Sequence, residues 1–221
     1  LWRNITHYGG QYGWFYGLGF IPLAEVFAIE FTVPIWVAIM AVFLLGEKLT
    51  RPRILAIVFG IIGLLLILRP GVEAVQPAAL AVLAAAVCYA LSHTLTKRLT
   101  RTDSAWSVVF YMTLIQLPFG LIPSLFNWVT PSGMMWFWLT FVGVAALSAH
   151  YCLSQALSLA DATVVVPMDF LRLPLIALVG FLFYNEGFDL LVLVGGAIML
   201  LGNWLNIRAE RRRTAAPAKA T

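Results

Sequence analysis

Charged residues are scarce in this sequence. Asp, Glu, Lys and Arg together make up only 11% of its 221 residues, whereas 62% are hydrophobic and the mean hydropathy is +0.91. A soluble domain carries roughly 25% charged residues and about half apolar ones, so this chain could not cover its own surface in water. The composition excludes an ordinary soluble fold and predicts an integral membrane protein.

Patterns for metal binding and for catalysis are lacking as well. The two cysteines, Cys88 and Cys152, lie in apolar runs without a partner at ligand spacing, which argues against a disulfide framework or a zinc site. The three histidines form no HExxH or His/Cys pattern, and no GxxxxGK[ST] phosphate loop occurs. No nucleophile has an evident base at bilayer depth. We therefore expect neither a cofactor nor a bound metal, and we expect that the protein is not an enzyme.

Long hydrophobic segments, by contrast, are abundant. A helix that crosses a bilayer needs about 20 mostly apolar residues. The sequence contains eight such segments joined by short connections, which predicts an all-α integral membrane protein with eight transmembrane helices. The predicted spans are residues 7–23, 27–45, 54–69, 77–96, 105–126, 135–157, 163–184 and 189–207.

Part of the sequence is repeated when the chain is shifted by 139 positions. Each copy contains an acidic residue followed by Phe, a nearby Pro, an apolar run, a Glu and a second apolar run broken by Gly. Repeated hydrophobic segments of this kind are typical of a duplicated membrane domain. The matched positions are Glu30-Phe31 with Asp169-Phe170, Glu47 with Glu186, and Gly63 with Gly202.

Basic residues predict the orientation of the chain. If the N-terminal segment is cytoplasmic, all of the 14 Lys and Arg residues except Arg69 and Arg172 fall in cytoplasmic segments. Cytoplasmic loops carry an excess of Lys and Arg, so we expect this orientation, with a cytoplasmic C-terminus. The net charge of +4 is explained in the same way and predicts no nucleic-acid partner. Glu47 then lies inside and Glu186 outside, which makes the two repeats inverted.

The predicted organisation is therefore a first repeat of three spans and a second repeat of five spans, followed by a basic tail. The tail is rich in small and polar residues, and we expect it to be disordered. In residue numbers, the partial first repeat is 1–71, the second repeat is 72–207 and the tail is 208–221.

Several short motifs occur in a fixed order in the first copy of the repeat and, more weakly, in the second. They are Glu30-Phe31-Thr32-Val33-Pro34, Leu44-Leu45-Gly46-Glu47-Lys48-Leu49, the glycines of residues 60–71, and a weaker echo in residues 169–186. With these motifs the chain resembles the EamA-like branch of the drug/metabolite transporter superfamily. That resemblance implies ten helices in two inverted five-helix repeats with a substrate cavity between them. It also implies that this chain, which starts at Leu1, lacks the first two helices.

Three charged residues fall inside predicted spans, where an unpaired charge is costly. Asp169 and Arg172 are i, i+3 neighbours and can pair on one helical face. Glu30 is the repeat equivalent of Asp169, and inverted symmetry would bring it to the same central region. Our hypothesis is a cluster at the repeat interface that holds substrate or gates the cavity. The alternative is an ion pair that only holds two helices together.

Other polar side chains inside the spans are expected to line the same cavity, because polar groups facing lipid would be unsatisfied. Glu47 and Glu186 lie at helix ends instead, and we expect them to contact basic loop residues or helix termini. The predicted cavity residues are Gln11, Trp14, Glu30, Tyr89, His93, His150, Gln155, Asp169 and Arg172.

The function predicted from these features is secondary transport across the cell (inner) membrane. The protein would be a permease or exporter of a small metabolite or drug-like solute, working by alternating access between inverted repeats. One alternative is a truncated, non-transporting membrane interaction protein, and another is an intramembrane enzyme. The expected partners are the solute and the lipid bilayer, and the glycines of the third and eighth spans offer a contact for a homodimer.

Overall fold

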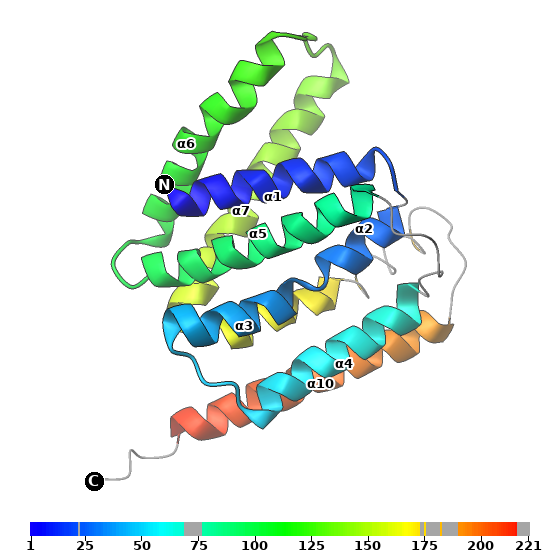
Figure 1. Cartoon of the computed structure of the whole chain (residues 1–221), viewed down its shortest axis with the longest axis vertical. Coiled ribbons are helices and arrows are strands. Elements are labelled where there is room, and N and C mark those ends of the chain that lie inside the picture. Colours follow the sequence, from blue (N-terminus) through cyan, green and yellow to red (C-terminus); the bar gives the residue numbers. More distant parts are fainter. Residues whose placement is uncertain (22, 69–76, 173–174, 176–181, 183–189, 216–221) are drawn as a thin grey trace.

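The computed structural model describes residues 1–21, 23–68, 77–172, 175, 182 and 190–215, and the regular elements in this part of the chain are all helical. Their arrangement is drawn in Figure 1. In chain order they are α1 (Trp2–Leu18), α2 (Leu23–Glu30), α3 (Val33–Leu45), α4 (Arg51–Leu68), α5 (Pro77–Leu99), α6 (Ala105–Leu125), α7 (Met134–Leu159), α8 (Ala162–Val165), the 3-10 helix η1 (Val166–Leu171) and α10 (Leu190–Ala215).

Three of these helices, α5, α6 and α7, are long and apolar enough to cross a bilayer, as judged by length and composition. Each has at least about 20 residues, the length that the hydrocarbon thickness requires. The stretches Val33–Leu45 and Ala162–Leu171 are shorter apolar helices. The described part of the chain is all-helical and the protein is a multi-pass membrane protein, which confirms the all-α membrane class expected from its composition.

Two predicted spans differ from the structure in form. The span predicted over 27–45 is two helices, because α2 ends at Glu30 and α3 begins at Val33. Pro34 lies in the first turn of α3, where its missing N–H costs nothing. The span predicted over 163–184 begins as α8 and tightens into η1, and most of its second half lies outside the described residues. Each break lies beside a proline at the start of a helix, Pro34 for α3 and Pro167 for η1, but the flanking residues are mostly apolar, so hydrophobic periodicity does not locate the breaks.

The first helix begins earlier than its apolar pattern suggests. Helix α1 starts at Trp2, whereas the predicted span starts at residue 7. The additional turn contains Arg3, which is buried and whose Nε donates a hydrogen bond to Thr96 Oγ1 at 3.0 Å. A paired polar group can be buried at low cost, so this turn continues the helix in spite of its charge.

The helices pack as two antiparallel pairs with further elements between them. Helix α1 lies along α5, and α4 lies along α10 (Figure 1). The elements α3, α8 and η1 lie between these two pairs, where they contact one another and α5 or α4. Buried glycines allow α4 and α10 to approach closely: a Cβ on Gly63 would lie 2.5 Å from the carbonyl oxygen of Gly195. Gly63, Gly195 and Gly202, which are among the glycines that we expected to offer a homodimer contact, lie between these two helices within one chain.

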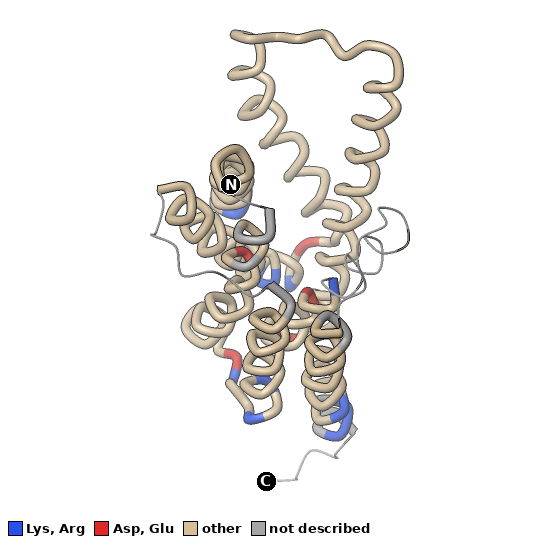
Figure 2. Tube along the Cα trace, turned by 90° about the vertical axis from the view of Figure 1, so that its right-hand side faces the viewer, with Lys and Arg blue, Asp and Glu red and all other residues tan. Residues whose placement is uncertain are grey.

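Helices α6 and α7 form a hairpin that projects from the other helices (Figure 1). No Asp, Glu, Lys or Arg occurs between Ser104 and Ala160, and the hairpin is uniformly uncharged in Figure 2. Its large hydrophobic side chains are mostly exposed. An uncharged helical surface of this kind suits contact with lipid, because most backbone polar groups are bonded inside the helices.

The contact between α1 and α5 depends on a small residue at Gly13. A Cβ at this position would lie 2.9 Å from the carbonyl oxygen of Ala81 and 3.2 Å from Cβ of Ala85. Small residues let membrane helices approach closely enough for backbone contact. The first glycine-rich segment is therefore a packing surface for α5.

We expect Gly13→Val to destabilise the protein by about 1–3 kcal/mol, because the carbonyl oxygen of Ala81 is backbone and cannot turn away. Thermal unfolding of the purified protein in detergent measures the effect. Gly9→Val is the matched control in the same helix, since the nearest atom to a Cβ there is Cys88 Sγ at 4.0 Å. Equal melting temperatures for the two variants would contradict this account of the α1–α5 contact.

Candidate functional site

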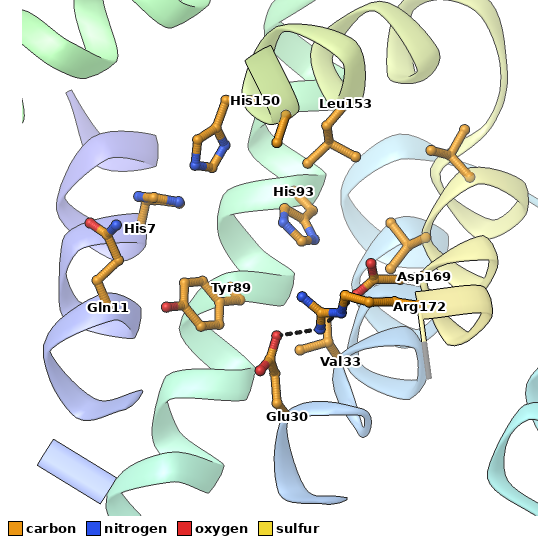
Figure 3. A pocket seen from close by; sticks show the side chains of 13 residues that line it. His7, Gln11, Glu30, Val33, Tyr89, His93, His150, Leu153, Asp169 and Arg172 are labelled. Carbon is orange, nitrogen blue, oxygen red and sulfur yellow. Dashed lines mark hydrogen bonds and ion pairs between the residues drawn. The ribbon is translucent and has the colours of Figure 1, made fainter. Parts of the chain in front are cut away.

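A cavity of about 340 Å³ lies between α1, the α2–α3 break, α5, α7 and the α8–η1 segment. Figure 3 shows its side chains converging from these elements. Apolar residues, Val33, Leu153, Val165 and Val166 among them, form part of the wall. The polar residues of the wall are His7, Gln11, Glu30, Tyr89, His93, His150, Asp169 and Arg172.

Arg172 lies between two carboxylates at this cavity. Its Nη2 is 2.8 Å from Glu30 Oε1 and 3.4 Å from Asp169 Oδ2. The side chain of Glu30 is 15% exposed, that of Arg172 is 39% exposed and that of Asp169 is 51% exposed. The cluster therefore stabilises charge within an apolar bundle while leaving part of each group open to a bound molecule.

Aromatic rings complete the surroundings of the guanidinium group. The Cζ atom of Arg172 lies 5.6 Å from the ring centroid of Phe27 and 5.2 Å from that of Phe31, which is within cation–π range. Phe31 stacks on Phe170 with centroids 5.8 Å apart, and both rings are fully buried. Glu30-Phe31 and Asp169-Phe170, the two dipeptides that the sequence repeat aligns, thus meet in space.

Trp14 positions Glu30 from behind the cavity wall. The indole Nε1 of Trp14 donates a hydrogen bond of 2.6 Å to Glu30 Oε2, while the other carboxylate oxygen of Glu30 accepts from Arg172. Both oxygens of Glu30 are therefore bonded. Trp14 was expected to line the cavity, but it contacts Glu30 instead and does not itself form part of the wall.

Three histidines reach the cavity from three different helices. The rings of His7 and His150 lie 4.7 Å apart edge to face, and Nδ1 of His7 is 3.0 Å from Nε2 of Gln116. Nδ1 of His93 is buried and has no hydrogen-bond partner among the residues that the structure describes. Within the described part of the chain, no three His, Cys, Asp or Glu side chains are placed to hold a metal ion.

Besides Trp14, one more predicted residue is not part of the cavity wall, and one residue that we did not predict is part of it. Gln155 is exposed and its Nε2 donates to the hydroxyl of Tyr151 at 3.2 Å. Five residues along a helix correspond to a rotation of about 140°, so Gln155 and His150 cannot share a face. His7 lines the cavity, and the signal for it was available: it lies four residues before Gln11, on the same face of α1.

These observations define a class of protein. A cavity with charged and polar side chains in its wall lies between apolar helices, and two of the elements that form it are interrupted beside it. Broken helices around a central cavity are typical of membrane transport proteins.

The sequence comparison identifies the family. Residues 5–69 and 76–208 match the sequence model of the EamA-like transporter family. The chain belongs to this family, and it is a membrane transporter of small solutes rather than an enzyme.

Named relatives transport different molecules. The chain is 27% identical over 210 residues to an S-adenosylmethionine uptake transporter of Rickettsia prowazekii, covering 95% of this chain and 71% of the relative. It is 30% identical over 210 residues to a riboflavin transporter of Vibrio cholerae, covering 92% and 70%. It is also 27% identical over 196 residues to the pseudopaline exporter CntI of Pseudomonas aeruginosa, covering 85% and 67%.

A solved crystal structure has the same fold. It superimposes with a TM-score of 0.83 and 19% sequence identity, covering 93% of this chain and 76% of that chain. At this identity the agreement concerns the arrangement of the helices alone.

The bond from Trp14 to Glu30 can be measured by a double-mutant cycle. We expect Trp14→Phe and Glu30→Gln to be non-additive, with a coupling free energy of about 1 kcal/mol, because Trp14→Phe removes the hydrogen bond and Glu30→Gln removes the charge of its acceptor. Unfolding in detergent is the measurement. Trp138→Phe, an exposed position on α7, is the control and should add independently to Glu30→Gln. Strict additivity for Trp14 would show that the bond contributes nothing.

Proposed function

We propose that this protein is a secondary transporter that binds a small organic solute in the cavity and releases it on the other side of the membrane by alternating access. The observation that carries this proposal is the link from Arg172 to Glu30, because it joins the two matched segments of the chain at a cavity. A solute bound there would contact both segments. Its binding could then bias how they lie relative to each other.

The proposed architecture is eight membrane-crossing segments in two inverted repeats, with residues 1–71 and 72–207 as the repeats. Its support is the meeting of equivalent positions: Glu30 and Asp169 share Arg172, and their neighbouring phenylalanines stack. Both repeats also have an irregular helix at this place. Positions related by a two-fold axis come together only near that axis, which is where transporters of this type bind their substrates.

In the proposed orientation the chain lies in the inner membrane of a bacterium. The basic residues at the ends of its helices then face the cytoplasm. Lys48, Lys97 and Arg101 lie at the same end of the helical bundle. Lys97 donates to a carbonyl group at the end of α7, and Arg101 donates to the carbonyl group of Leu45 at the end of α3, shortly before Lys48. Arg208 follows on α10. Cytoplasmic loops attract such residues, and the C-terminus would be cytoplasmic as well.

The chemistry of the cavity indicates what the solute carries. Two carboxylates and one guanidinium face it, so its charged groups have an excess of negative charge. Nε of Arg172 and Nδ1 of His93 are buried and have no hydrogen-bond partner in the described part of the chain, and a polar ligand would satisfy such groups. Among the solutes of its named relatives, S-adenosylmethionine has positive centres and a carboxylate, whereas riboflavin is uncharged. We therefore propose S-adenosylmethionine as the first solute to test.

Transport assays on Arg172 test the proposed site. In proteoliposomes, Arg172→Gln should lower uptake of S-adenosylmethionine by about tenfold or more, because it removes a charge-assisted contact of about 1.5–3 kcal/mol. Arg172→Lys keeps the charge but not the planar fork, and it should retain part of the activity. Both variants must first show a normal melting temperature. A well-folded Arg172→Gln protein with unchanged uptake of every solute that the native protein carries would refute the site.

The same assay tests whether Glu30 carries a proton. If it does, Glu30→Gln should abolish uptake driven by a pH gradient, because a neutral amide cannot release a proton, and it should spare exchange of labelled for unlabelled solute. Asp169→Asn is the matched change at the equivalent position. Unchanged gradient-driven uptake in Glu30→Gln would exclude this role.

A further inference from the structure

A second polar cluster joins the two matched segments away from the cavity. Glu47, which follows α3, accepts hydrogen bonds from the backbone N–H groups of Ala162 and Thr163 at 2.8 and 3.0 Å. It also accepts one from the hydroxyl of Thr163 at 2.6 Å. A carboxylate at the first N–H groups of a helix is favourable, because these groups have no partner within the helix. The carboxylate of Glu47, in the first matched segment (residues 5–69), therefore caps the start of α8, in the second matched segment (residues 76–208).

Arg53 strengthens the same junction. It is fully buried in the first turn of α4, and its Nη2 is 2.6 Å from Asp161 Oδ2. Its Nη1 donates to Thr163 Oγ1 at 2.8 Å and lies 4.0 Å from Glu47 Oε2. Glu47, Arg53, Asp161 and Thr163 form a single cluster, which we call the cytoplasmic lock. Its bonds are charge-assisted and mostly buried, so they are stronger than surface ion pairs.

The local backbone is shaped to bring Glu47 to this position. Helix α3 ends at Gly46, which has a φ of +71°, and the N–H of Glu47 closes the helix on Ala41. This left-handed conformation suits glycine and turns the chain sharply after the helix. Lys97 holds the other side of the junction by donating to the carbonyl groups of Leu157 and Ala160, both at 2.7 Å. The turn that carries Asp161 is therefore fixed within its own segment.

A buried apolar cluster lies between the cavity and the lock. It includes Val33, Val37, Ala90, Leu157, Ala162 and Val166, and we call it the apolar plug. Val33 and Val166 are also part of the cavity wall, while Ala162 donates its N–H to Glu47. The plug thus extends from the cavity to the lock. For a solute to leave the cavity towards the end of the bundle that carries Glu47 and Arg53, α3 and α8 must move apart.

We propose that the cytoplasmic lock and the apolar plug together are the gate of this transporter on the cytoplasmic side, closed in this structure and opened by separation of α3 from the 160–163 turn. The proposal rests on the proposed function and orientation. Alternating access requires contacts between the segments that hold in one state and break in the other. The lock has this property because every bond from Glu47 to Ala162 and Thr163 joins residues more than 100 positions apart.

Cysteine accessibility tests the gate without any transported solute. Cys88 and Cys152 are replaced by Ala, and Val37→Cys is introduced as a reporter, because Val37 is fully buried in the plug and is not part of the cavity wall. A membrane-impermeant maleimide is applied to inside-out and to right-side-out vesicles. In inside-out vesicles, Glu47→Gln and Asp161→Asn should each raise the labelling rate by about tenfold, since each loses at least one charge-assisted bond of the closed state.

Arg98→Gln is the matched control. It removes one charge at the same end of the molecule, but its exposed side chain makes no hydrogen bond or ion pair with the described residues. The labelling rate of Val37→Cys in this variant should equal the rate in the protein whose lock residues are unchanged. If Glu47→Gln fails to fold, Thr163→Val removes the hydroxyl between Glu47 and Arg53 without changing any charge, and the same increase is expected.

Three results would overturn the gate: unchanged labelling in folded lock variants, an equal increase in Arg98→Gln, or an increase confined to right-side-out vesicles. The readout is independent of transport. A protein that moves no solute but opens in the lock variants would refute the proposed function and leave the gate standing. A protein that transports solute while Val37→Cys stays inaccessible in the lock variants would refute the gate and leave the proposed function standing.

Discussion

The cost of placing charge in an apolar environment is the constraint that this structure depends on. An isolated ionised group is costly in hydrocarbon, and the cost is offset only when opposite charges and hydrogen bonds surround it. The structure meets this requirement at Arg172, with two carboxylates and two aromatic rings, and at Arg53, with Asp161, Thr163 and Glu47 nearby. In both places at least one compensating group comes from a distant part of the sequence: Glu30 for Arg172 and Asp161 for Arg53. Pairing these charges therefore also specifies how the two segments meet.

The two clusters differ in exposure. The group around Arg172 is partly open to a cavity, whereas Arg53 is fully enclosed. A partly open cluster can exchange one of its partners for a ligand without leaving a charge unpaired. An enclosed cluster must be broken by movement of the backbone that carries it. The same chemistry thus suits binding in one location and closure in the other.

The sequence predicted the fold class and the contact between Glu30, Asp169 and Arg172, because scarce charges in apolar runs constrain their own partners. It also predicted that Glu47 contacts basic loop residues or helix termini, and in the structure its carboxylate accepts from the N–H groups of Ala162 and Thr163 at the start of α8. It did not predict the helix breaks after Glu30 and within the α8–η1 segment. Apolar residues favour burial in either conformation, so hydropathy alone carries no information about where a helix stops.

Other features were hidden for geometric reasons. Gln155 was expected at the cavity because it is polar and close in sequence to His150, but rotation along the helix separates them. The particular partners of Glu47 could not be read from local sequence, since Ala162 and Thr163 follow it by more than 100 residues. Likewise, glycines that could serve contact between two chains or within one are indistinguishable until a neighbouring helix is placed. Here they pack α4 against α10.

The contact of α1 with α5 has a mechanical consequence. Where backbone meets backbone, as Gly13 does at Ala81, no flexible side chain lies between the helices to take up a change in their spacing. Val26 of α2 and Val82 of α5 share a buried cluster, which ties a third helix to this pair. These three helices are thus suited to move as a rigid body, and relative motion must then be concentrated where side chains alone separate neighbours.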